Sequence, residues 1–195
     1  MSKDTFRSSL RAAVRAHWAG VLNRREFRDS FDGSLDKYLR EAWNVGGAHY
    51  GITQEDYTQR ELNQRDRFIL EQIKLADGFA EDIAKNAKAK GGALESLLSR
   101  VDLWTNRYDE LSNIARVMAA EDSPLRWMLG KTDKHCVSCK SLQDWVKRAS
   151  YWDDFYKETG LRPQSEKLAC NGYHCACRLS PTRMQISKGR PPVIV

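Results

Sequence analysis

The sequence predicts a mainly α-helical protein, in which a bundle of long helices is followed by a small cysteine-rich β-hairpin module of the zinc-ribbon kind. Apolar residues recur every three or four positions through most of residues 1–122, a pattern typical of packed helices. All five cysteines lie in the last third of the chain, at short spacings. We therefore expect a helical body at residues 1–122, a metal-binding module at residues 123–187 and an extended tail at residues 188–195.

The composition is that of a folded protein. Of its 195 residues, 41% are hydrophobic and 30% are charged, with only 12 glycines and 5 prolines, which excludes collagen-like, mucin-like and fully disordered chains. No stretch approaches about 18 uninterrupted apolar residues, and the first residues lack the apolar core of a signal peptide. We therefore expect a protein that folds in a cytoplasm and has no membrane partner.

The first two helices are predicted from apolar stripes. One stripe recurs every four residues from Phe6 to Leu22, so its members share one helix face. A second stripe starts at Phe27, continues across Gly33 and ends near Gly46. These two segments predict two helices that pack through one face each.

A third helix is predicted to start at Thr53, because acidic residues follow it in what would be the first turn. Its apolar residues are widely spaced, so we expect this helix to be paired on one side only. The basic run from Lys85 to Lys90 ends at two glycines and predicts a hinge or an exposed loop.

The clearest periodicity follows this loop and forms a heptad seam. Apolar residues alternate steps of four and three along a helix that Pro124 ends, because proline cannot continue a helix. We interpret the seam as part of an intramolecular bundle, and self-association of two chains through a coiled coil is the alternative. The seam residues are Leu97, Val101, Trp104, Tyr108, Leu111, Ala115 and Met118.

The cysteines carry the most specific signal. Cys136 and Cys139 form a C-x-x-C turn, and Cys170, Cys175 and Cys177 follow as a second group. In a reducing cytoplasm such spacings favour a metal site over disulfides. Four thiolates in a tetrahedron suit zinc, and we predict one structural zinc ion per chain, held by Cys136, Cys139, Cys175 and Cys177.

Other ligand sets remain open. Cys170 is an alternate for either of the last two cysteines, and His135 or His174 is an alternate ligand or a hydrogen-bond donor to a ligand. Disulfides formed outside the reducing cytoplasm, or free buried thiols, are the alternatives to a metal.

Short strands are expected around the cysteines. The residues from Trp145 to Ala149, together with Tyr151 and Trp152, predict a short strand or hairpin between the two cysteine groups. Residues 178–181, which follow Cys177, predict a brief strand that ends at proline.

The sequence predicts no catalytic residues and no cofactor other than zinc. A catalytic zinc needs an open coordination position and a nearby base, and neither is evident in this pattern. The signatures of zinc deaminases, serine hydrolases and zinc proteases are also missing from the sequence. We therefore expect a protein that is not an enzyme, and a nuclease or toxin built on the cysteine module is the enzymatic alternative.

The positive charge is concentrated at one end. Residues 1–133 contain 21 basic and 21 acidic residues, whereas residues 134–195 contain 11 basic and 5 acidic ones, so this last third carries the whole net charge of +6. An excess of this kind favours an acidic partner such as DNA. A zinc-dependent nucleic-acid-binding module is therefore an alternative function.

Five short motifs lie in the second half of the chain: Trp127-Met128-Leu129-Gly130-Lys131-Thr132, His135-Cys136-x-x-Cys139 with Leu142 after it, Arg148-Ala149-Ser150-x-Trp152, Arg162-Pro163-Gln164-Ser165, and Cys170-x-Gly172-x-x-Cys175-x-Cys177-Arg178-Leu179. Together they resemble the C-terminal module of tailed-phage head morphogenesis proteins, the minor head proteins similar to protein F of phage Mu. The resemblance covers roughly residues 100–185, and its most specific parts are the C-x-x-C and the late C-x-C-R-L. The chain departs from the familiar pattern by its extra Cys170 and by the residues that follow it.

The resemblance implies a non-enzymatic structural component of a bacteriophage head. Such a protein is expected in the host cytoplasm during assembly and then in the procapsid or virion, in few copies. Its implied partners are the portal and capsid subunits, and its implied role is to assist head assembly or DNA packaging.

Overall fold

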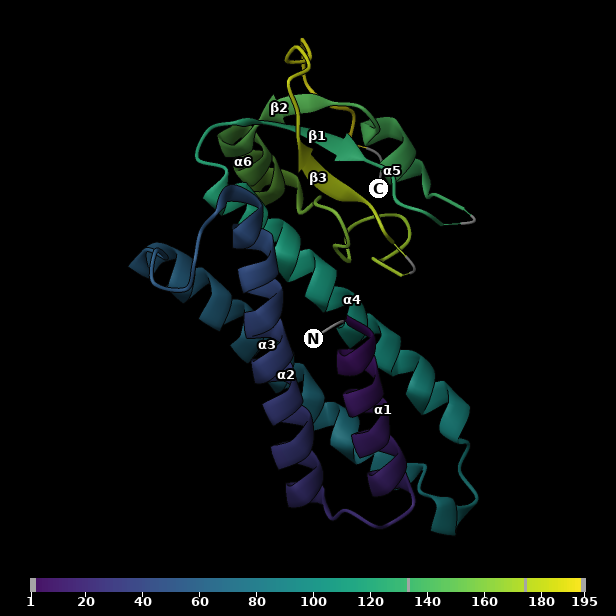
Figure 1. Ribbon diagram of the computed structural model, residues 1–195. Helices are drawn as coiled ribbons and strands as arrows, with labels where there is room; N and C mark the ends of the chain where they lie inside the picture. The colour runs from purple at the N-terminus through teal and green to yellow at the C-terminus, as the bar shows by residue number, and fades with distance from the viewer. Residues whose placement is uncertain (1–2, 133, 174, 194–195) are drawn as a thin grey trace. The chain divides into compact units, whose positions relative to one another are not determined.

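The computed structural model describes residues 3–132, 134–173 and 175–193 (Figure 1). Along this described part of the chain, four long helices precede three short strands and two short helices. The predicted fold class, mainly α-helical with a small β-containing, cysteine-rich end, is confirmed. The elements are α1 (Lys3–Trp18), α2 (Arg24–Gly47), η1 (Ala48–Tyr50), α3 (Gln59–Lys85), η2 (Lys88–Lys90), α4 (Leu94–Ala119), β1 (Pro124–Met128), α5 (Val137–Leu142), β2 (Val146–Arg148), α6 (Ala149–Thr159) and β3 (Arg178–Pro181).

Local chemistry sets the boundary between the first two helices. α1 ends at Trp18, before the predicted Leu22, because Gly20 adopts a left-handed φ of +77° that ends the helix. α2 begins after Asn23, whose side-chain oxygen accepts the N–H of Glu26 at 3.0 Å. The Glu26 carboxylate accepts the Asn23 N–H at 2.8 Å, which completes a capping box.

α3 begins later than the sequence predicts. Thr53 donates its N–H and its hydroxyl to the Asp56 carboxylate, and the Asp56 N–H donates to the Thr53 carbonyl oxygen, but these bonds close only a turn. Thr58 and Glu61 repeat the same pattern five residues later, and the helix starts at Gln59 within this second box. The prediction of a helix start at Thr53 is wrong because the sequence offers two capping boxes, and the apolar stripe follows only the second.

The chain divides into two compact units. Residues 1–41 group with residues 62–108, and residues 42–61 group with residues 109–195. The chain passes between the units within α2, α3 and α4. The predicted boundary at residue 122 differs from the boundary of these units, because the end of α4 groups with the cysteine-rich end. That the parts on either side of residue 122 fold independently stays a prediction.

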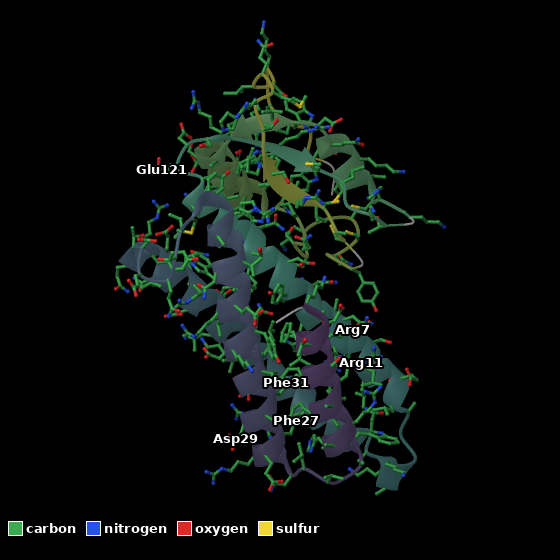
Figure 2. All side chains as sticks on the ribbon, viewed as in Figure 1. Arg7, Arg11, Phe27, Asp29, Phe31 and Glu121 are labelled. Atoms are coloured by element: carbon green, nitrogen blue, oxygen red, sulfur yellow. The ribbon has the colours of Figure 1, made fainter. Side chains whose placement is uncertain are left out.

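The core of the first unit is aromatic. The Trp104 ring on α4 lies 5.4 Å from the Phe31 ring of α2 and 5.0 Å from the Phe79 ring of α3. Figure 2 shows Phe31 and Phe27 on α2, and the Phe27 and Phe31 rings are 5.2 Å apart. Trp104 belongs to the predicted heptad seam, whose members are buried except for the half-buried Met118. This burial is what we expect if the seam packs against other helices of the same chain.

The second unit contains a three-stranded antiparallel sheet in the order β2-β1-β3 (Figure 1). β1 is central, and its Leu125 and Trp127 alternate with less buried residues, as expected for a strand with one buried face. The Trp127 ring lies 5.7 Å from the Trp152 ring of α6, and Leu179 of β3 joins the same core. The sequence predictions did not include β1, because Pro124 was interpreted only as the end of a helix.

One local prediction in this unit needs correction. Tyr151 and Trp152 were expected in a strand or hairpin, but they lie in α6. Ala149, Trp152 and Phe155 are buried at a spacing of three residues, which is a helical spacing. The predicted strand at residues 178–181 is present as β3.

The predicted tail lies against the sheet without regular structure through its described residues. The Lys147 ammonium donates to the Ser187 and Gly189 carbonyl oxygens at 2.7 Å and 2.6 Å. The Arg190 guanidinium lies 2.7 Å from a Glu158 carboxylate oxygen. Within the described residues, no helix is long and apolar enough to cross a membrane.

Candidate metal centre

Three buried cysteines converge at one end of the sheet. The Sγ atoms of Cys139, Cys175 and Cys177 all lie within 4.8 Å of one another, and those of Cys139 and Cys175 are 3.9 Å apart. A tetrahedral ion with metal–sulfur bonds of about 2.3 Å separates its sulfurs by about 3.8 Å. The three thiols are therefore close enough to bind one metal ion.

Local structure places the C-x-x-C turn. Cys136 is the N-cap of α5, and its Sγ accepts the backbone N–H of Cys139 at 3.4 Å. The C-x-x-C spacing thus puts Cys139 inside the cluster and Cys136 beside it, although Cys136 is outside the group of three within 4.8 Å.

The alternate ligands lie in different surroundings. The half-buried Cys170 packs against the core that contains Cys139 and Cys175 but, like Cys136, is outside the group of three within 4.8 Å. The Nδ1 atom of His135 lies 3.0 Å from the Thr132 hydroxyl, with which it forms a hydrogen bond. His174 lies outside the described residues.

The thiols share protons unequally. Hydrogen bonds with Cys139 and then with Cys175 lower the pKa of Cys177 to about 4, and a hydrogen bond with Cys139 lowers the pKa of Cys175. The pKa of Cys139 is raised, because its thiol hydrogen-bonds with Cys170, Cys175 and Cys177. Two thiols of the cluster are thus shifted toward the thiolate and one toward the neutral thiol, and the thiolate is the form that a soft metal cation binds.

Close backbone packing supports the cluster. Gly130, which follows β1, lies against the segment that carries Cys175 and Cys177. A Cβ atom at Gly130 would come within 2.0 Å of the Ala176 carbonyl oxygen, so only glycine permits this approach. The Gly130 N–H also donates to the Cys177 sulfur.

A buried amide pair connects the loop that carries Cys175 and Cys177 to α4. The Gln164 side-chain amide donates to the carbonyl oxygens of Cys175 and Cys177. The Asn113 side chain donates to Gln164 Oε1 at 2.8 Å and accepts the Leu179 N–H at 3.2 Å. These contacts hold the backbone at Cys175, at Cys177 and at Leu179 just after the pair. The sequence motifs predicted no role for either amide.

The signals for these supporting residues differ in strength. Gly130 and Gln164 lie within two of the motifs that carry the family resemblance. Asn113 lies inside a helical apolar pattern, where a polar residue gives no sign of a partner 51 residues away. A buried polar pair of this kind becomes visible only when the fold is known.

The chain matches no protein-family model, no curated protein and no solved structure. Membership of the head morphogenesis family therefore remains a prediction that rests on the five motifs.

Proposed function

We propose that the chain is a minor head protein of a tailed phage, a structural component of the procapsid or virion that is associated with the portal and assists head assembly or DNA packaging. The observation that carries the proposal is the meeting of Cys139 with Cys175, 36 residues apart in sequence. The C-x-x-C and the C-x-C-R-L are the most specific motifs of the resemblance, and both contribute to one buried cluster. This is the arrangement expected if they form a structural element of that family.

The proposed ion is a structural zinc, one per chain, held by Cys136, Cys139, Cys175 and Cys177. The N–H···S contact at Cys136 supports it as the fourth ligand, and Cys170 is the alternate. Thiolates are soft donors that suit zinc, and four of them leave no open position for a reacting water. The ion would therefore stabilise the fold and supply no chemistry.

We expect about one zinc per chain in protein purified under reducing conditions, measured by native mass spectrometry. We also expect the chain in low copy number in procapsids or virions made by cells that carry its gene, measured by quantitative peptide mass spectrometry. Absence of the chain from both kinds of particle would contradict the head-protein proposal. A metal-free chain that has lost thiol hydrogens would contradict only the zinc proposal and favour disulfides.

A second candidate function, DNA contact, is favoured by the charges near the metal centre. Lys131, Lys134 and Lys140 are exposed around the C-x-x-C turn, and none forms an ion pair with another described residue. By contrast, Arg126 and Arg148 in the sheet pair with carboxylates. Lysines without carboxylate partners are available to neutralise phosphates.

If these lysines contact DNA, binding of a duplex should weaken steeply with salt. The triple variant Lys131→Gln/Lys134→Gln/Lys140→Gln should reduce the slope of log K against log salt by about one unit per lysine. A triple change at exposed lysines of the first unit, Lys74→Gln/Lys85→Gln/Lys90→Gln, is the matched control and should leave the slope unchanged. Equal slopes for the two triple variants, or no binding at low salt, would contradict DNA contact.

A further inference from the structure

A groove in the second unit has the opposite charge to the rest of the cysteine-rich end. Its volume is about 520 Å³, within the range of pockets that hold a small ligand or a few side chains. It is lined by the segment before α3 and the first turn of α3, by the end of α4 and the residues just after it, and by one face of α6. The lining residues are Ile52, Asp56, Thr58, Arg60, Glu61, Val117, Met118, Ala119, Glu121, Ala149, Ser150, Asp153, Asp154 and Lys157.

The floor of the groove is apolar. Val117 and Met118 lie on α4 and are half-buried, and Ile52 and Ala149 extend the same surface. Met118 is the last residue of the heptad seam and the one seam member that the protein leaves partly uncovered. The apolar stripe of α4 therefore continues into the groove.

The rim is acidic, with five carboxylates against two cations. Both cations contact carboxylates of α6: Lys157 Nζ lies 2.7 Å from Asp153 and 3.2 Å from Asp154, and Arg60 lies 3.7 Å from Asp153. The other three carboxylates, on Asp56, Glu61 and Glu121, form no ion pair among the described residues. The negative charge of these three carboxylates is therefore not neutralised by an ion pair with another described residue, and a cationic partner could neutralise it.

Glu121 is held at this rim by an unusual backbone conformation. It follows the end of α4 (Figure 2) and has a φ of +52°, which costs a residue other than glycine free energy of about 1 kcal/mol or more. Asp56 is fixed as well, because hydrogen bonds from Thr53 hold its carboxylate and lower its pKa. The backbone position of Glu121 and the carboxylate of Asp56 are therefore both fixed by local structure at the rim of the groove.

We propose that this groove is a docking site for a segment of another protein in which lysine or arginine residues alternate with apolar ones. The cations would meet the rim carboxylates, and the apolar side chains would cover Met118 and Val117. A metal ion fits less well, because among the described residues only the cysteine cluster brings three ligand atoms within 4.8 Å. A small hydrophilic cation would leave the floor uncovered. The proposal depends neither on the proposed zinc ion nor on the head-protein assignment.

The test uses the 195-residue chain, purified under reducing conditions, and a short fluorescent peptide of alternating lysine and leucine. A peptide of alternating glutamate and leucine is the probe of opposite charge. Fluorescence anisotropy at low and high salt should show salt-sensitive binding of the lysine peptide only. The variant Glu121→Gln/Asp154→Asn should weaken binding about three- to fivefold, as expected for exposed charge pairs. The variant Glu71→Gln/Glu166→Gln makes the same change in charge outside the groove and should bind like the unaltered protein.

Methyl NMR of labelled methionine locates the bound peptide. The peptide should shift the Met118 signal and leave those of Met128 and Met184, which do not line the groove, unchanged. Equal shifts at all three methionines, equal effects of the two double variants, or binding of the glutamate peptide would overturn the proposal. So would a native mass that shows a dimer which the lysine peptide disrupts, because the occupant would then be a second copy of this chain.

Discussion

Changing Cys177→Ser is expected to abolish binding of the proposed zinc ion and to unfold the residues around the cysteine cluster. In small zinc modules, ion binding supplies on the order of 10–16 kcal/mol of folding free energy. The sheet beside the cluster has three strands of three to five residues each, too few to form an independently stable core. The aromatic core of the first unit does not include any cysteine and should remain folded.

Hydrogen exchange followed by mass spectrometry measures both effects in one sample. In Cys177→Ser, amide protection should be lost over residues 124–181 and retained in α1 and in the first half of α4, with zinc content near zero. Cys170→Ser is the matched control, because the proposed ligand set excludes Cys170, and it should retain zinc and protection. Full protection of residues 124–181 in metal-free Cys177→Ser would refute a structural role for the ion. Zinc loss in Cys170→Ser, with zinc retained in Cys136→Ser, would assign the fourth ligand to Cys170.

Changing Leu111→Asp is expected to remove most of the free energy of unfolding of the second unit. Leu111 lies on α4 with none of its surface exposed. Truncation of a buried leucine costs about 2–5 kcal/mol, and an uncompensated buried carboxylate adds several more. A domain of this size is stable by only about 5–15 kcal/mol.

Two further variants separate the causes in a thermal melt followed by circular dichroism. Leu111→Ala removes the packing without a charge and should lower the melting temperature less than Leu111→Asp does. Arg190→Ala removes an exposed ion pair with Glu158 and should change stability by less than about 1 kcal/mol. Equal melting temperatures for Leu111→Asp and Arg190→Ala would show that Leu111 is not a core residue.

Local patterns were sufficient for much of the helical structure. The stripe from Phe27 predicted α2, which continues through Gly33 and ends at Gly47. The heptad pattern predicted α4, and the glycines after Lys90 predicted its separation from α3. These predictions succeeded because apolar residues at helical spacing commit a long segment to one buried face, whatever its partner.

Short elements could not be predicted in the same way. β1 is a five-residue strand whose two buried side chains give little periodicity, and it is a strand because β2 and β3 pair with it on both sides. The residues of α6 include aromatic side chains that suit a strand as well as a helix. In both segments tertiary pairing decided between two local conformations.

The sequence by itself determined that the protein is mainly helical, that its cysteines lie together at one end, and that their spacing suits a metal. Those properties follow from the period of apolar residues and from the short chain distance within each cysteine group. The tertiary structure alone decided that Cys139 meets Cys175 and Cys177. It also decided that Gln164 and Asn113 connect the loop of the late cysteines to α4. Finally, it brought acidic residues from separate segments around one groove. These contacts join residues far apart in the chain, and their partners are chosen by packing of the whole fold, for which no local pattern contains the information.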